Sequence, residues 1–160
     1  MKLDLAIREL HRAERKLARE LTAVAARHKA DHEVYHVARD IAGWSTDHVH
    51  RLARAGHRYG LGLDSNPRTA PRTAPVQERL STLLGRRGGE PALLLLIDLR
   101  HLHRIAAGVS LDWELLAQGA QATGDTGLLE LAARCHPETL RQMRWANSML
   151  KNLAPQILAS

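Results

Sequence analysis

The sequence predicts an all-α protein, a four-helix bundle, from three observations. Apolar residues recur at spacings of three and four through most of the chain, which is the period of one helix face. The 160 residues contain no Phe and only 3% aromatics, so Leu, Ala, Val and Ile must fill the core. Such a core favours packed helices over a sheet, where β-branched and aromatic residues are enriched. Turn-forming residues gather near 60–90 and 123–127, which divides this single-domain length into two helical pairs.

The first predicted helical pair covers residues 3–58, and polar residues interrupt the apolar stripe of its first helix. Glu14 and His28 take positions that the stripe would otherwise fill. We expect this helix to end near Ala30, because Asp31 is a favourable N-cap for the helix that follows. The stripe itself consists of Leu3, Ile7, Leu10, Leu17, Leu21 and Val24.

The second predicted helix runs from about His32 to about His57, and it too carries a polar residue on its apolar face. His48 takes the stripe position between Trp44 and Leu52. The glycines at 60 and 62 end this helical pair. The apolar stripe consists of Val34, Val37, Ile41, Trp44, Leu52 and Ala55.

Glu14 and His48 are expected to meet inside the bundle. Glu14 lies 17 residues before Asp31 and His48 lies 17 residues after it, so the two side chains should stand at one level. Burial of a carboxylate is costly unless the group is paired, protonated or bound to a metal. The two residues therefore form either a structural hydrogen-bonded pair or half of a metal site.

Residues 60–90 are predicted to form a long linker, with room for a short helix over 76–84. Segment 67–75 holds three prolines in a tandem repeat, Pro-Arg-Thr-Ala followed by Pro-Arg-Thr-Ala-Pro, which favours an extended chain. The first helix is roughly 40 Å long, and about 15 extended residues cross that distance. A crossover that joins parallel second and third helices is therefore feasible.

A second pair of helices is predicted over residues 91–154. Pro91 stands in the first turn of the third helix, a position that proline favours. The cluster 123–127 ends that helix, and the fourth helix is expected to stop at Pro155. Pro137 lies inside the fourth helix and is expected to kink or split it.

The first two helices resemble those of ferritin-like four-helix-bundle proteins. The residues that carry the resemblance are Glu14, within His-Arg-Ala-Glu-Arg-Lys-Leu, and His48, within Ser-Thr-Asp-His-Val-His-Arg-Leu. In that superfamily the first helix offers a metal-binding Glu and the second an E-x-x-H pair. The resemblance implies a ferritin-like long crossover between the second and third helices. It also implies that Glu14 and His48 bind a divalent metal ion, iron or zinc.

The sequence departs from the ferritin-like pattern at the other ligand positions. Ser45 stands where a Glu would bridge two metals, three residues before His48. In the second helical pair, Gly108 and Gln142 stand at the matching level, and neither is a carboxylate or histidine. In the segment Glu-Thr-Leu-Arg at 138–141, arginine replaces the histidine of an E-x-x-H pair. A full di-iron centre is therefore not expected.

Two weaker acidic candidates lie in the second half. Asp98 and His101 have the i, i+3 spacing of a ligand pair, but Asp98 should lie near the far end of the bundle, solvated or salt-bridged. Glu114 and Glu138 stand at one level if the turn is centred on residue 126, so they form a second candidate carboxylate site.

The remaining histidines and the single cysteine are expected to play no catalytic part. Cys135 is followed by His136, but no third group orients the pair, and a lone helical cysteine is more often a small buried hydrophobe. One cysteine also excludes an internal disulfide framework. The histidines expected at the surface are His11, His32, His36, His50 and His57.

Charge and hydropathy suggest partners and location. The net charge of +6 is carried mostly by arginine, which permits an acidic partner. The charged start and the absence of a long apolar run lead us to expect a cytoplasmic protein without a membrane span. A homodimer is expected, because several apolar residues lie outside the primary stripes. These are Leu95, Leu99, Leu102 and Trp113.

Three functions remain open from the sequence. The favoured one is a ferritin-like scaffold without the full di-metal site, which acts as a non-catalytic binding or structural protein and retains at most one weak metal site. The second is a di-iron oxidoreductase or peroxidase, against which Ser45 argues. The third is non-specific nucleic-acid binding by linker arginines, which would contact phosphates. Those arginines are Arg68, Arg72, Arg86 and Arg87.

Overall fold

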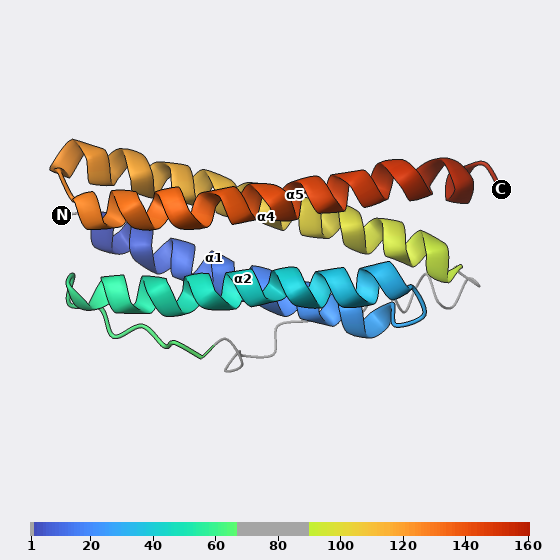
Figure 1. Cartoon of the computed structure of the whole chain (residues 1–160), viewed down its shortest axis with the longest axis horizontal. Helices are drawn as coiled ribbons and strands as arrows, with labels where there is room; N and C mark the ends of the chain where they lie inside the picture. Colours follow the sequence, from blue (N-terminus) through green and yellow to red (C-terminus); the bar gives the residue numbers. More distant parts are fainter. Residues whose placement is uncertain (1, 67–89) are drawn as a thin grey trace.

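The structure, a computed structural model, describes residues 2–66 and 90–160, and within them it is all-α (Figure 1). Its elements are four long helices, and the described residues include no strand. None of these helices has both the length and the apolar character needed to cross a membrane. The predicted all-α, four-helix fold is therefore confirmed. The helices are α1 (Leu3–Arg27), α2 (His32–His57), α4 (Pro91–Thr123) and α5 (Thr126–Leu158).

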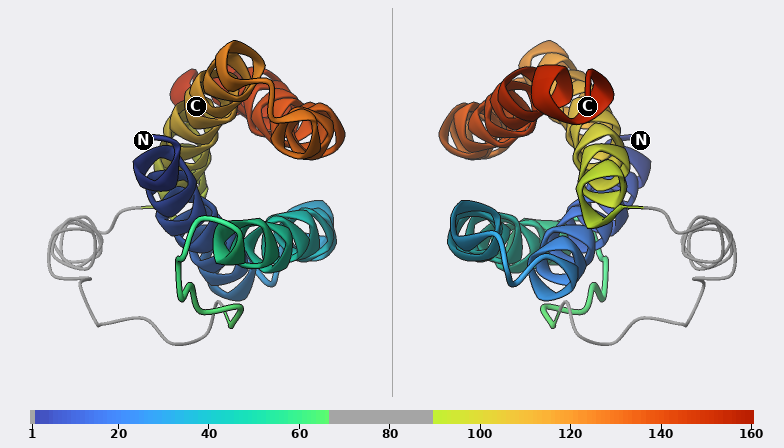
Figure 2. Two further views of the ribbon diagram at one scale, coloured as in Figure 1. Left: turned by 90° about the vertical axis from the view of Figure 1, so that its left-hand side faces the viewer. Right: turned by 90° about the vertical axis from the view of Figure 1, so that its right-hand side faces the viewer.

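The helices form two hairpins that are joined through α1 and α4. α1 packs along α2, α4 along α5, and α1 along α4, whereas α2 meets α5 over a shorter stretch. Figure 2 shows an open, C-shaped cross-section with α2 and α5 at its two ends. α2 and α4 run in the same direction, from right to left in Figure 1. Most of the connection between them, including the predicted linker and short helix, lies in residues 67–89, outside the described residues.

Local side-chain chemistry sets the two tight turns. Asp31 and Asp125 each accept a hydrogen bond from a backbone N–H three residues later, at 3.0 and 2.9 Å. Each bond satisfies one of the free N–H groups at a helix start. Gly124 follows α4 with a φ of 71°, in the left-handed region that glycine adopts without strain. α1 ends at Arg27, three residues before the predicted Ala30, and the bounds of α2 are as predicted.

α5 is one continuous helix through both of its prolines, so the predicted split at Pro137 and the predicted stop at Pro155 are wrong, and a kink at Pro137 stays a prediction. An interior proline removes one backbone hydrogen bond and costs about 3 kcal/mol. Pro137 is exposed, and so is Ala133, whose carbonyl loses its partner, so water can replace the lost bond. The packing of α5 along α4 stabilises the helix on both sides of the interruption.

The core includes the four apolar residues on which the homodimer expectation rested. Leu95, Leu99, Leu102 and Trp113 are all buried within one chain. They therefore need no second copy to cover them, contrary to the reason given for the homodimer. They are buried because α4 packs against both α1 and α5, and a helix between two neighbours needs apolar residues on more than one side.

After α2 the chain folds back against the bundle. Leu61 is buried and a Cβ added at Gly56 would lie 3.3 Å from its Cβ, so the two backbones approach closely. Further along, His11 Nε2 lies 2.7 Å from the backbone carbonyl oxygen of Asp64. His11 is therefore buried and not at the surface as predicted, because the segment after α2 covers it.

Candidate functional site: a buried polar centre

The four helices meet at a polar centre built around Glu14. Glu14 lies in the middle of α1, and its side chain is fully buried. Its Oε1 accepts hydrogen bonds from His48 Nδ1 of α2 at 2.8 Å and from Trp113 Nε1 of α4 at 2.7 Å. Thr139 of α5 adds a longer contact, 3.5 Å from its Oγ1 to the same oxygen. The predicted approach of Glu14 and His48 is confirmed, and every helix contributes a side chain to the centre.

His48 connects Glu14 to two groups on α5. The atom on the other side of its ring, Nε2, has no hydrogen-bond partner in the described part of the chain. Glu138 Oε1 lies 3.8 Å from Nε2, and Cys135 is near enough to the ring to affect its pKa. Burial by itself lowers the pKa of His48, but the polar contact with Cys135 and the hydrogen bond to Glu14 outweigh it and raise the pKa to about 10. The raised pKa favours the protonated imidazole, so His48 is expected to pair with Glu14 as an imidazolium.

A second polar link joins α5 to α2 about one turn away. Gln142 Nε2 donates hydrogen bonds to the Ile41 carbonyl and to Ser45 Oγ, both at 2.9 Å. The level predicted for Gln142 is thus correct to within one helical turn. Gly108 also lies near its predicted level, because it lines a groove together with Ala13, the neighbour of Glu14. Neither position supplies a carboxylate or a histidine to the centre.

The geometry constrains the metal-binding role predicted for Glu14 and His48. The facing atoms, Glu14 Oε1 and His48 Nδ1, are bonded to each other, so a metal between them requires this bond to break. The Trp113 indole N–H is a donor only and cannot ligate a cation. Glu14 Oε2 and His48 Nε2 are left as ligand atoms. Among the described residues, no group of three or more His, Cys, Asp or Glu side chains is placed to hold one ion.

Cys135, His48 and Glu14 bring together a thiol, an imidazole and a carboxylate, the groups of a nucleophilic triad, but among the described residues His48 Nε2 has no hydrogen-bond partner. The sequence pairs Cys135 with His136, but His136 Nε2 lies instead 2.7 Å from Ser110 Oγ on α4. His48, which is distant in the sequence, takes its place. The Cys135 thiol is fully buried, however, so a substrate does not reach it in this structure.

A second ionic cluster lies at the C-terminal end of α1. Arg27 donates two hydrogen bonds of 3.0 Å to Asp98, and His28 Nε2 lies 2.7 Å from the same carboxylate. Burial raises the pKa of Asp98, but the hydrogen bonds from His28 and Arg27 outweigh it and hold the pKa below its usual value. Asp98 is thus salt-bridged as predicted, although buried. His101 does not join it and lies 4.0 Å from Glu20 instead.

The other predicted candidates stay apart from the centre. Glu114 is exposed, whereas Glu138 faces His48, so the proposed pair of these two carboxylates does not form a site. The four linker arginines lie outside the described residues. The histidines that are exposed as predicted are His32, His36, His50 and His57.

Trp113 and Thr139 are the residues of the centre that sequence reasoning missed. Trp113 lies five residues beyond Gly108, the position expected at the level of Glu14. Helical side chains point back toward the N-terminus, so the long indole reaches that level from a later position. The sequence offered one general indication of its role: a buried Trp side chain needs a hydrogen-bond acceptor for its indole N–H.

The fold and the centre define a four-helix-bundle protein with a buried ionic network. Comparison with known proteins adds no closer assignment, because the chain matches no family model, no curated protein and no solved structure.

Proposed function

We propose that this chain is a ferritin-like bundle protein that lacks a di-metal centre and acts as a binding or structural protein. The observation that carries the proposal is the set of donors on Glu14 Oε1: imidazole, indole and hydroxyl groups from three other helices. A ferritin-like di-metal centre instead places carboxylates from several helices around two cations about 3.5 to 4 Å apart. Here groups that carry protons surround the central carboxylate.

A single iron or zinc ion is expected to bind only weakly at Glu14 and His48. The ion has to displace the proton of His48, whose pKa is raised to about 10. At pH 7 this competition lowers the apparent affinity by about a thousandfold relative to a neutral imidazole. Binding also breaks the hydrogen bond between the two side chains. In this proposal a proton on His48 balances the charge of Glu14 in the resting protein.

The proposal also covers chain topology, assembly and location. The parallel directions of α2 and α4 support the ferritin-like long crossover between them. A homodimer stays a prediction, and Leu111 and Leu115, exposed on one side of α4, are the apolar residues that a second copy would cover. Light scattering that gives one chain mass at micromolar concentration would contradict it. A cytoplasmic location and nucleic-acid binding by the linker arginines stay predictions as well.

The test of the proposed function compares metal content and oxygen chemistry. Protein purified without an affinity tag is analysed for iron and zinc, and iron-loaded protein is assayed for oxygen and peroxide consumption. We expect less than one equivalent of metal per chain and no turnover above free iron. The Glu14→Ala variant is compared with Glu114→Ala, which removes an exposed carboxylate on α4. Two equivalents of iron, with turnover lost only in Glu14→Ala, would establish the di-iron oxidoreductase or peroxidase alternative.

A further inference from the structure

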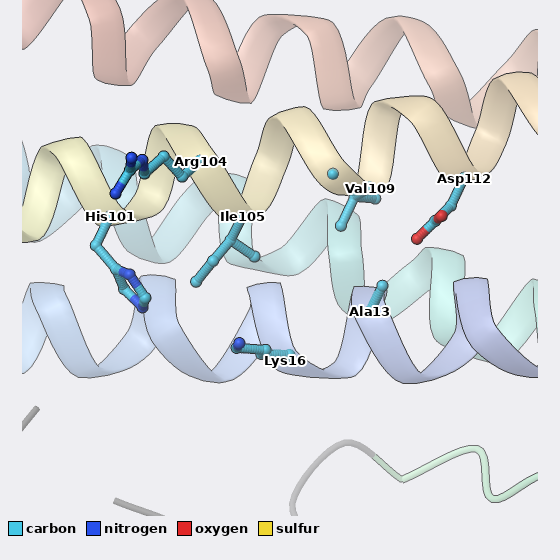
Figure 3. Close-up of a pocket in the computed structure, with 8 residues that line it drawn as sticks. Ala13, Lys16, His101, Arg104, Ile105, Val109 and Asp112 are labelled. Carbon is cyan, nitrogen blue, oxygen red and sulfur yellow. The ribbon is translucent and has the colours of Figure 1, made fainter. Parts of the chain in front are cut away.

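A groove of about 300 Å³ lies between α1 and α4 (Figure 3). Apolar side chains line its middle: Ala13 of α1 with Ile105 and Val109 of α4. Ligand pockets begin at about this volume, so the groove has the size for a small molecule and not for a peptide or a large cofactor.

The two ends of the groove carry opposite charges. In Figure 3 the nitrogen atoms of His101 and Arg104 lie toward one end and the carboxylate of Asp112 lies toward the other, while the Lys16 nitrogen lies below Ile105. His101 faces Glu20 at 4.0 Å. Neither Lys16 nor Arg104 forms a salt bridge within the part of the chain that the structure describes. Among the described residues, two cations without a salt-bridge partner therefore line the part of the groove away from Asp112.

Gly108 keeps the middle of the groove open. It lies inside a 33-residue helix, where glycine costs about 1 kcal/mol relative to alanine. Its φ is not positive, so the backbone does not require glycine. A Cβ built there meets no atom within 4 Å, so packing does not require it either. Because Gly108 lines the groove, a larger side chain would occupy the space of a ligand.

Asp112 differs from an ordinary surface carboxylate. It is partly buried, and this burial, with the negative charges of Glu9 and Glu14, raises its pKa. No salt bridge to Asp112 is formed among residues 2–66 and 90–160. A neutral hydrogen-bonding group suits this end better than a second anion does.

We propose that the groove binds the phosphomonoester of a small hydroxylated molecule. The Lys16 ammonium and the Arg104 guanidinium match the charge of about −2 on such a phosphate and donate to its oxygens. The apolar middle accommodates the carbon skeleton, and Asp112 accepts a hydrogen bond from a hydroxyl group at the far end. The inference deepens the proposed binding role and rests on it, but it does not depend on the metal content of the polar centre.

The test follows amide shifts of the ¹⁵N-labelled full chain during titration with ribose 5-phosphate. We expect saturable shifts that centre on residues 13–16 and 104–112 and that weaken as salt is added. Ribose and inorganic phosphate, titrated separately, should each bind at least tenfold more weakly. Absence of saturable shifts, or equal binding of inorganic phosphate, would overturn the proposal. Oxygen turnover in the metal assay is a separate readout, so the two proposals can fail independently.

Matched variants locate the binding site. Gly108→Leu should abolish binding by filling the groove, whereas Gly43→Leu, also a helical position with open space around its Cβ, should leave it unchanged. Lys16→Gln and Arg104→Gln should each weaken binding at least tenfold. Asp112→Asn should weaken binding of ribose 5-phosphate and leave that of inorganic phosphate unaltered. The proposal is wrong if Gly108→Leu folds, as its amide spectrum will show, and still binds with the affinity of the original chain.

Discussion

The ion pair between Glu14 and His48 gives the sharpest test of the polar centre. Both side chains are fully buried, so removal of one partner leaves a charge that water does not reach. Breaking a buried pair from one side typically costs about 3 to 5 kcal/mol. His48→Gln should lie in this range at pH 7, because it keeps a donor near Glu14 but removes the positive charge. This is a large part of the roughly 5 to 15 kcal/mol by which such domains are stable.

Glu14→Gln should cost less, about 1 to 2 kcal/mol, because His48 can then release its proton. The amide oxygen that replaces Oε1 still accepts from Trp113, whose donor atom lies 2.7 Å from Oε1. The double variant, Glu14→Gln with His48→Gln, contains no buried charge at the pair. Its destabilisation should therefore fall well below the sum of the two single effects.

Urea unfolding at pH 7, followed by far-ultraviolet circular dichroism, measures the free energy of unfolding of the original chain, the two single variants and the double variant. A matched surface change, Glu114→Gln, should alter the stability by less than about 0.5 kcal/mol. Additive effects of the two single variants, or a cost below about 1 kcal/mol for His48→Gln, would refute the view that the centre holds a buried imidazolium and carboxylate.

Three further predictions concern pH, the second ionic cluster and helix glycines. Because the pKa of His48 is raised from 6.5 to about 10, the folded chain holds one extra proton between these pH values, and its stability should fall by about 1.4 kcal/mol per pH unit as pH rises through them. Urea unfolding at several pH values should show this slope in the original chain and not in the double variant. Because the pKa of Asp98 is lowered in the folded chain, its ionised carboxylate stabilises the fold above pH 3.8, and this stabilisation is lost as the pH falls further. Asp98→Asn should lower the free energy of unfolding by about 3 kcal/mol at pH 7 in the same assay. Gly108→Ala should stabilise the chain by up to about 1 kcal/mol, whereas Gly119→Ala should gain less, because its Cβ meets Leu3 Cδ2 at 2.7 Å; thermal unfolding compares the two.

Local sequence patterns predicted the helices and one contact of the centre. Helix period and the caps at Asp31 and Asp125 are local properties, so they predict the helix bounds to within a few residues. The equal distances of Glu14 and His48 from Asp31 predict their contact, because a tight turn sets the relative level of two antiparallel helices. The same local rules predicted a split at Pro137 and a stop at Pro155, and neither occurs, because the packing of α5 along α4 outweighs an intrinsic preference.

The other groups around Glu14 depend on how the two hairpins pack together. Trp113 and Thr139 come from the other hairpin, whose rotation and shift relative to α1 depend on how whole helix surfaces pack. A change of one residue turns a helical side chain by about 100°, so an uncertainty of one turn in level leaves its direction unspecified. The contacts of His48 with Cys135 and of Asp98 with Arg27 and His28 have the same origin. The sequence contains each of these residues, but close packing between the hairpins selects their partners.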